Sequence, residues 1–176
     1  MQAPLKLTPT SYIVLGMLRW LGEATPYQLK QAVAQSTGNF WTLQHAALYA
    51  EPKRLAAAGY VSESLEEGGR RRRRYALTDT GRQALADWTA EPTDDLGELR
   101  EPALLKLFFG ADPLLLAPMQ LEAHRRKLAE YEAIRDGMPA EIPDGPRLAL
   151  AMGIRAERQF IAYWEELVDA RDGDQG

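Results

Sequence analysis

Residues 59–81 read GYVSESLEEGGRRRRRYALTDTG, and this stretch decides the fold. Residues 60–65 and 75–77 have the composition of two short strands, and the Gly-Gly pair between them predicts a tight turn. The stretch therefore predicts a β-hairpin whose returning strand is basic. The basic residues are five consecutive arginines: Arg70, Arg71, Arg72, Arg73 and Arg74. Thr78 follows as a helix N-cap, so we expect another helix directly after the hairpin.

Three helices are predicted ahead of the hairpin. Two Thr-Pro pairs, at residues 8–9 and 25–26, each combine an N-cap hydroxyl with a proline at the first helical position. The first pair starts a helix over residues 9–21. The second starts a shorter helix that ends at the turn residues Ser-Thr-Gly-Asn. A third helix runs from about residue 43 to residue 58 and ends before a glycine.

The third helix has two different faces. At about 100° per residue, Leu48, Pro52 and Leu55 share one side, which predicts a buried face. The opposite side and its flanks carry small, polar and cationic residues: Thr42, His45, Ala46, Tyr49, Ala50, Lys53, Arg54 and Ala57. Methyl groups allow a close approach to another surface, and hydroxyls or a lysine there can meet base edges or phosphates.

Charge separates the chain into two halves. Residues 1–90 hold 11 Lys/Arg against 7 Asp/Glu, whereas residues 91–176 hold 10 against 18. A basic half of this kind is expected to meet a polyanion. The acidic half reads as wholly helical, with a short apolar segment over residues 103–109 and a last helix that begins near Asp144. A longer helix lies between these two, although Pro118 leaves its start open. Long amphipathic helices need a partner surface, so we expect a homodimer.

Composition excludes several classes of chemistry. The chain has no cysteine and only two histidines, so it lacks disulfides, thiolate nucleophiles and cysteine-ligated zinc. It also lacks a phosphate-cradling glycine motif and a recognisable catalytic arrangement. We therefore predict no enzyme activity, no cofactor and no metal. The start has no secretory pattern, and the most apolar tract is interrupted by charges, so we expect a soluble cytoplasmic protein without a membrane segment.

The order helix, helix, helix and basic hairpin is that of a winged helix-turn-helix, in which the third helix enters the major groove of DNA. The predicted fold class is mainly α. Residues 1–92 form the winged helix-turn-helix DNA-binding domain, with three helices plus a β-hairpin wing. Residues 93–176 form a helical domain for dimerisation and, as a further possibility, effector binding. Double-stranded DNA is the expected partner. Because side chains alternate along a strand, only part of the arginine run can reach phosphates, and the third helix must read the sequence.

Several of these segments resemble the PadR family of bacterial transcriptional regulators. They are SYIVLGMLRW, TPYQLK, NFW, ALYAEPKRLAAAGYV, RRYALTDTG and EPALLKLFF, in this order over about the first 110 residues. In that family a tyrosine of the third helix, here Tyr49, and a basic residue four positions on, here Lys53, lie at the DNA surface beside the wing. Most members repress transcription as dimers on inverted repeats and release DNA on binding a small effector. The resemblance therefore implies these properties here.

The expected DNA contacts also include three residues of the second helix, Tyr27, Gln28 and Lys30. Two departures from the family concern the third helix. Many members have leucine at Pro52, and a proline inside a helix predicts a kink that re-aims the residues around it. A serine or threonine often caps the helix where Gln44 stands, so we expect the cap to pass to Thr42.

Aromatic residues offer a place for a dimer core or a small aromatic or apolar effector: Trp41, Phe160, Tyr163 and Trp164. The stripe through Phe160 and Trp164 predicts dimer core first, although an aromatic seam between subunits also suits a flat ligand. An alternative function is a winged-helix module that binds an acidic protein, with the arginines facing carboxylates instead of phosphates. Duplex binding across a salt series separates the two functions.

Overall fold

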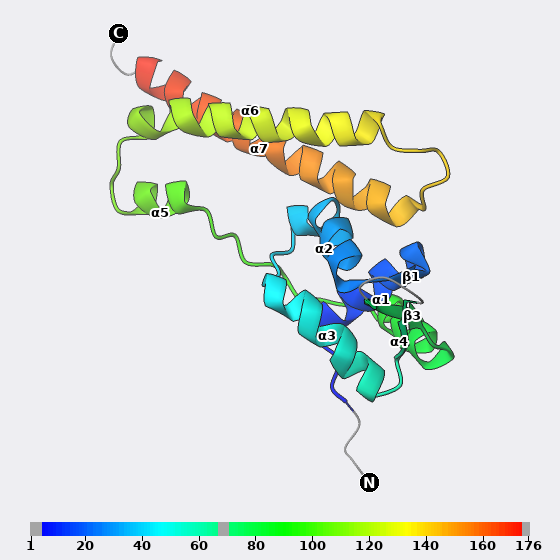
Figure 1. Ribbon diagram of the computed structural model, residues 1–176. Helices are drawn as coiled ribbons and strands as arrows, with labels where there is room; N and C mark the ends of the chain where they lie inside the picture. The colour runs from blue at the N-terminus through cyan, green and yellow to red at the C-terminus, as the bar shows by residue number, and fades with distance from the viewer. Residues whose placement is uncertain (1–4, 67–70, 174–176) are drawn as a thin grey trace. The chain divides into compact units, whose positions relative to one another are not determined.

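The computed structural model describes residues 5–66 and 71–173 and divides the chain into two compact units, residues 1–95 and 96–176 (Figure 1). This division falls close to the domain boundary predicted after residue 92. The elements are α1 (Pro9–Leu21), β1 (Glu23–Ala24), α2 (Pro26–Ala34), the 3₁₀ turn η1 (Thr37–Asn39), α3 (His45–Ala57), β2 (Val61–Leu65), β3 (Arg73–Leu77), α4 (Asp79–Ala90), α5 (Pro102–Phe108), α6 (Pro113–Asp136) and α7 (Asp144–Gly173). The predicted fold class, mainly α with a winged helix-turn-helix and a helical C-terminal part, is confirmed.

Side-chain caps start the first two helices. Ser11 Oγ accepts a hydrogen bond from the backbone N–H of Thr8 at 2.8 Å, and Thr8 Oγ1 accepts one from the N–H of Ser11 at 3.4 Å. Thr25 and Gln28 form the same reciprocal box at the start of α2. Each box satisfies backbone donors that a helix end leaves without partners. The range predicted for the first helix, residues 9–21, is confirmed.

One apolar core joins nearly all elements of the N-terminal unit. Its buried members come from every helix and strand except η1: Val14, Leu15, Met17, Leu18, Ala24, Leu29, Val33, Leu48, Leu55, Val61, Tyr75 and Leu85. Full burial of a large aliphatic side chain stabilises a fold by about 1.5–3 kcal/mol. The core therefore fixes α3 and the sheet with respect to α1.

The third helix differs from its prediction at the start. It begins at His45, and its N-cap residue Gln44 makes no side-chain cap, so the expected cap from Thr42 does not form. The helix continues unbroken through Pro52 to Ala57. Pro52 is fully buried, and this apolar contact offsets the backbone hydrogen bond that a proline cannot donate.

The predicted hairpin is present and gains a third strand. The strand order is β1-β3-β2, and both pairs are antiparallel. In the hairpin, Glu63 pairs with Tyr75 and Leu65 pairs with Arg73. The third strand, β1, pairs Glu23 with Ala76 and was not predicted from the sequence. It closes the open edge of β3.

Residues 77–81, which read LTDTG, attach the hairpin to the end of α3. Thr78 caps α4 as predicted, and its Oγ1 also lies 2.7 and 2.9 Å from the carbonyl oxygens of Gly59 and Tyr60. Gly59 has a φ of +82°, a left-handed conformation that suits the residue after a helix. Gly81 packs against the same turn, since a Cβ at this position would lie 2.0 Å from the Tyr60 carbonyl oxygen. Residues 59–81 thus hold the hairpin base against two helices.

In the C-terminal unit, α6 and α7 run antiparallel along their length (Figure 1). They approach closely at Gly153, where a Cβ would lie 2.9 Å from Tyr131 Cε2. Ala103 of α5, Ala117 of α6 and Trp164 of α7 form the buried core at one end. The helix start that the sequence left open lies at Pro113, and α6 continues through Pro118.

Candidate nucleic-acid interface

α3 presents to solvent the face that the sequence predicted. Tyr49 is 45% exposed, and its neighbours on this face are exposed as well: Thr42, His45, Ala46, Ala50, Lys53 and Ala57. On the opposite face, Leu48 and Leu55 belong to the core. The helix therefore combines a fixed inner face with an outer face of methyl groups, a phenol and an ammonium group.

A buried carboxylate fastens α3 to α1. Glu51 is 8% exposed, and Ser11 Oγ of α1 donates to Glu51 Oε1 at 2.6 Å. Arg54 donates from Nη2 to Oε1 at 2.5 Å and from Nε to Oε2 at 2.8 Å. Burial disfavours the ionised carboxyl, but the hydrogen bonds from Arg54 and Ser11 outweigh that cost and lower the pKa of Glu51. Three charged or polar groups thus set the position of the helix.

Arg54 is predicted from the sequence to contact DNA, and the structure gives its guanidinium other partners. Besides Glu51, it donates to Ser11 Oγ at 2.9 Å and to the carbonyl oxygen of Lys6 at 3.2 Å. Arg54 therefore helps to hold α3 in place, and its contact with DNA stays a prediction. Sequence reasoning missed Glu51, although its i, i+3 spacing to Arg54 was a usable signal.

The wing, which comprises β2, β3 and the turn between them, divides its arginines into two groups. Arg73 forms an ion pair with Glu63 on the neighbouring strand. Arg74 Nε lies 2.9 Å from Glu23 Oε2, and its Nη1 lies 3.3 Å from Glu66 Oε1. These cross-strand pairs neutralise both guanidiniums and link the three strands.

Arg71 and Arg72 form the second group. Both are exposed, and neither side chain has a hydrogen bond or an ion pair to any described residue; the backbone of Arg72 accepts a hydrogen bond from the N–H of Glu66 at 3.0 Å. Arg71 has a φ of 44°, which is the left-handed region found at turns. The predicted contact residue Arg70 lies outside the described residues. The described part of the wing therefore offers two unpaired guanidiniums to an anion.

The predicted contact residues of α2 differ in their surroundings. Tyr27 is 57% exposed, and its hydroxyl accepts from Gln31 Nε2 at 3.3 Å. Lys30 is half-buried. Gln28 is exposed, but its Oε1 accepts from the backbone N–H of Thr25 at 2.9 Å as part of the helix cap. The T-x-x-Q spacing was the sequence signal for this second role.

The aromatic residues of α7 pack against side chains of the same chain. Trp164 is fully buried in the core with Ala103 and Ala117, so the prediction that it forms a seam between subunits is wrong. Tyr163 meets Trp164 edge to face at 5.6 Å, and Phe160 stacks on His124 at 4.6 Å with an interplanar angle of 11°. Tyr163 and Phe160 are half-buried, and their predicted contact with an effector stays a prediction.

Trp41 is the fourth aromatic residue predicted at a dimer or effector contact. It lies in the N-terminal unit, between η1 and α3, and is 45% exposed. Its ring is therefore partly accessible, and its predicted role stays a prediction.

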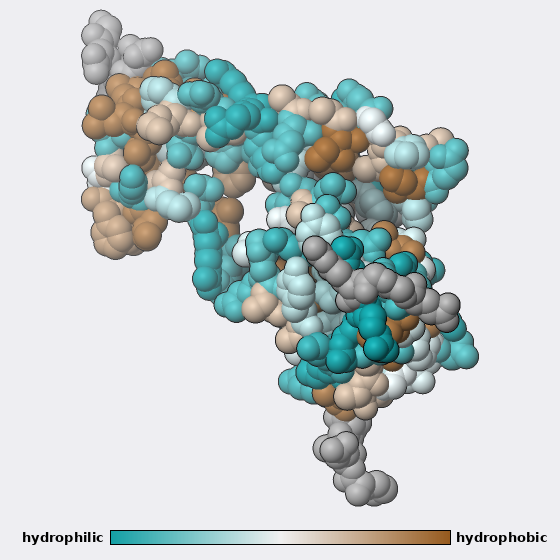
Figure 2. All heavy atoms as spheres, viewed as in Figure 1, coloured by the Kyte–Doolittle hydropathy of each residue, from teal (hydrophilic) through white to brown (hydrophobic). Residues whose placement is uncertain are grey.

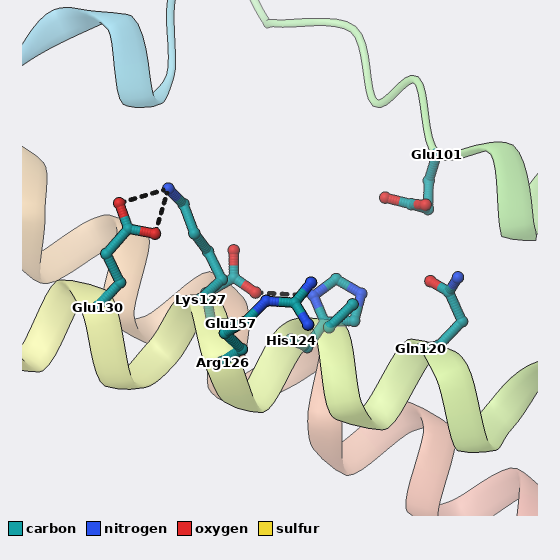
Figure 3. Close-up of a pocket in the computed structure, with 8 residues that line it drawn as sticks. Glu101, Gln120, His124, Arg126, Lys127, Glu130 and Glu157 are labelled. Carbon is teal, nitrogen blue, oxygen red and sulfur yellow. Dashed lines mark hydrogen bonds and ion pairs between the residues drawn. The ribbon is translucent and has the colours of Figure 1, made fainter. Parts of the chain in front are cut away.

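A polar hollow of about 490 Å³ lies in the C-terminal unit (Figure 3). His124 Nδ1 is 2.7 Å from Glu157 Oε2, and Lys127 Nζ is 3.1 Å from both carboxylate oxygens of Glu130. Glu101 extends from the segment before α5, opposite Gln120 of α6 (Figure 3). Cations and carboxylates are thus mixed around this hollow, and the lining does not suit an apolar effector.

No helix within the described ranges combines the length and the hydropathy that a membrane span requires. In the same part of the chain, no three His, Asp or Glu side chains are placed to hold a metal ion.

Comparison with known proteins gives consistent matches. The model of the transcriptional regulator PadR-like family matches residues 14–87. The negative transcriptional regulator PadR of Bacillus subtilis is 27% identical over 178 residues, which cover 93% of this chain and 97% of the relative. The probable transcriptional regulator Rv1176c of Mycobacterium tuberculosis is 30% identical over 166 residues, which cover 82% of this chain and 88% of the relative.

Solved structures share the fold over nearly the whole chain. Bacillus subtilis PadR in complex with operator DNA superposes with a TM-score of 0.79 at 25% identity, covering 91% of this chain and 97% of that one. The same regulator in complex with p-coumaric acid gives a TM-score of 0.74 at 24% identity, covering 95% and 99%. Family members are transcriptional regulators and not enzymes, so the prediction of a non-enzyme is confirmed. The chain, with its winged helix-turn-helix and helical C-terminal unit, belongs to the PadR-like family of transcriptional regulators.

Proposed function

We propose that this protein is a transcriptional repressor that binds operator DNA through α3 and the wing. The observation that carries the proposal is the exposed α3 face, followed directly in the chain by a wing in which Arg71 and Arg72 have no carboxylate partner among the described residues. Guanidiniums bind phosphates, and a helix with small side chains fits the major groove. The relative from Bacillus subtilis is a negative regulator and was solved with operator DNA.

On this proposal the residues have distinct tasks. Tyr49 and Lys53, with Thr42, His45 and Ala46 nearer the start of the helix, contact base edges and nearby phosphates. Arg71 and Arg72 contact phosphates without regard to sequence. Tyr27 and Lys30 of α2 contribute further phosphate contacts.

We also propose that the repressor is a homodimer on an inverted repeat. An apolar patch on the C-terminal unit supports this: Leu105, Phe108, Phe109, Leu115 and Met119 are between 61% and 82% exposed. Figure 2 shows hydrophobic side chains gathered over α5 and the adjoining end of α6. Patches of this kind mark interaction sites, and a second copy of the chain is the simplest partner. A twofold axis would then place two α3 helices on two half-sites.

The dimer is tested by light scattering. Phe108 is 82% exposed, so Phe108→Asp should leave the fold intact and shift the particle to a monomer. Leu65→Asp, at an apolar residue of the wing that is 49% exposed, is the matched control and should stay dimeric. A wild-type chain that is monomeric at micromolar concentration would contradict the proposal.

Sequencing of genomic fragments retained by the purified protein tests the DNA site. We expect inverted repeats whose half-site centres are about 10–10.5 base pairs apart, or a multiple of that spacing. Absence of binding to any duplex at low salt would reject DNA and favour an acidic protein partner for the wing.

Finally, we propose that a small effector releases the protein from DNA, because the relative from Bacillus subtilis was also solved with p-coumaric acid.

A further inference from the structure

A second hollow, of about 330 Å³, lies where α6 ends and α7 begins. Four arginines line it: Arg135, Arg147, Arg155 and Arg158. None of its eight lining residues is Asp or Glu. The half of the chain that contains it holds only 10 Lys/Arg against 18 Asp/Glu. We call this site the arginine hollow, because its charge is opposite to that of the unit around it.

Carboxylates outside the lining neutralise part of this charge. Arg158 Nη2 lies 2.7 Å from Glu132 Oε1, and Arg135 Nη1 lies 3.9 Å from the same oxygen. Arg135 Nε also lies 2.8 Å from Asp136 Oδ1. Two carboxylates therefore face four guanidiniums, and positive charge remains in excess.

The other two arginines are available in different ways. Arg147 donates from Nε to the carbonyl oxygen of Ile142 at 3.4 Å and from Nη2 to that of Pro139, which holds its side chain beside the α6–α7 connection. A guanidinium has five N–H donors, so Arg147 keeps donors for a ligand. Arg155 is exposed, and its guanidinium has no ion pair or hydrogen bond to a residue in the described ranges.

The rest of the lining is apolar. Ile154 is 6% exposed, and Leu150, Ala151 and Met138 are half-buried. A rim of guanidiniums over an apolar wall suits a ligand with an anionic group at one end and a hydrocarbon body at the other. The polar hollow of Figure 3 lacks this division, because carboxylates and cations are mixed there.

We propose that the arginine hollow binds a small amphipathic organic monoanion, namely a carboxylate with a single ring or a short hydrocarbon chain. The volume is at the lower end of the range of about 300–1,000 Å³ for small-molecule sites, which excludes large ligands. This inference rests on the proposed control by an effector, to which it assigns a site and a chemical class. It also replaces the aromatic seam of α7 as the expected site.

Calorimetry on the full-length protein, without DNA, tests the site. The probes are three carboxylates: 3-phenylpropionate, benzoate and octanoate. The controls are 3-phenylpropionamide, the neutral isostere of the first probe, and inorganic phosphate, an anion that has no hydrocarbon group. At least one carboxylate should bind, and its amide or phosphate should bind at least about tenfold more weakly, because a charge-assisted hydrogen bond exceeds the 1.4 kcal/mol that corresponds to tenfold. If no carboxylate binds at millimolar concentration, or if amide or phosphate binds equally well, the proposal is overturned.

Variants locate the binding. Arg155→Gln should weaken the carboxylate about tenfold. Arg125→Gln is the matched control, because Arg125 is an exposed arginine of the same unit that pairs with Glu165 at 2.6 Å and does not line the hollow. Ala151→Trp should block binding by filling the hollow, whereas Met152→Trp, at a neighbour that is 65% exposed, should not. Equal affinity for the wild type and Arg155→Gln would overturn the assignment.

Duplex binding is measured separately, so the two proposals can fail independently. Loss of affinity of Arg155→Gln for a non-cognate duplex, in the absence of any carboxylate, would identify the hollow as a phosphate contact and overturn the inference. A wild-type protein that binds a carboxylate but no duplex would instead reject the proposed function and keep the site.

Discussion

The two groups of wing arginines should respond differently to mutation. Each Lys or Arg that neutralises a phosphate of duplex DNA contributes about 0.9 to the slope of log K against log salt concentration. The guanidiniums of Arg71 and Arg72 have no partner in the described part of the chain, so Arg71→Gln/Arg72→Gln should lower that slope by about 1.8 for each bound wing. A dimer with both wings on DNA should lose about 3.6.

The matched control is Arg73→Gln/Arg74→Gln, which removes the same number of charges from the same wing. These arginines pair with Glu63, Glu66 and Glu23, so we expect the slope to remain close to that of the wild type. The ion pairs are partly exposed and worth about 0–1 kcal/mol each, so the domain should still fold, which a thermal melt will verify.

Fluorescence anisotropy with a labelled random-sequence duplex of about 30 base pairs, titrated between about 50 and 200 mM salt, measures both slopes. A non-cognate duplex suffices, because phosphate contacts do not depend on sequence. If the salt slope falls as much in the Arg73/Arg74 double variant as in the Arg71/Arg72 variant, the ion pairs with glutamate do not prevent Arg73 and Arg74 from contacting DNA. The division of the wing would then be wrong.

Three further substitutions test the N-terminal unit. Gly81→Ala places a Cβ 2.0 Å from a backbone oxygen, so it should lower the free energy of unfolding, measured in urea, by at least about 1–3 kcal/mol. Gly16→Ala is the control: no atom lies within 4 Å of its Cβ, so the free energy of unfolding should rise by about 0.5–1 kcal/mol. Equal effects of the two variants would contradict the packing at Gly81. Glu51→Gln should lower the free energy of unfolding by about 1–2 kcal/mol at neutral pH. The difference between variant and wild type should disappear as the pH falls below about 4.5, because a carboxyl with a lowered pKa adds stability only while it is ionised. A difference that does not depend on pH would refute the role of its charge. Trp88 stacks on Tyr12 of α1 with ring centroids 4.4 Å apart. Trp88→Ala should therefore lower the free energy of unfolding by about 0.5–1.5 kcal/mol more than the loss of buried area alone accounts for. A double-mutant cycle of Trp88 and Tyr12 that shows no coupling would exclude the stack.

Short-range signals in the sequence predicted much of the N-terminal unit. The hydroxyls of Thr8, Thr25 and Thr78 each begin a helix, because an N-cap bond forms within three residues and needs no distant partner. The two faces of α3 also follow from local periodicity. Features of this kind are written in a few adjacent residues, so one sequence is sufficient to find them.

Features that depend on distant residues were not predictable in this way. β1 has two residues, too few to show an alternating pattern, and it exists because β3 offers it an edge. Glu51 lies beside the buried face of α3, but its hydrogen-bond donor Ser11 is forty positions earlier and becomes its neighbour only in the fold. The contact of Arg54 with Ser11, 43 positions earlier, likewise depends on the fold and was not visible in the sequence.

The arginine hollow is the strongest case of this kind. Arg135 lies at the end of α6, and three further arginines lie on α7: Arg147, Arg155 and Arg158. Each alone has the pattern of a solvated cation on an acidic chain. The antiparallel return of α7 along α6 brings them to one place, while Glu132 and Asp136 offset only part of their charge. Net charge therefore describes how a half of the chain acts at long range, and its binding sites depend on which charges the fold brings together. An acidic regulatory unit can for this reason bind an anion. A carboxylate bound where α6 connects to α7 would act on the α6–α7 helix pair, whose other end carries the apolar patch.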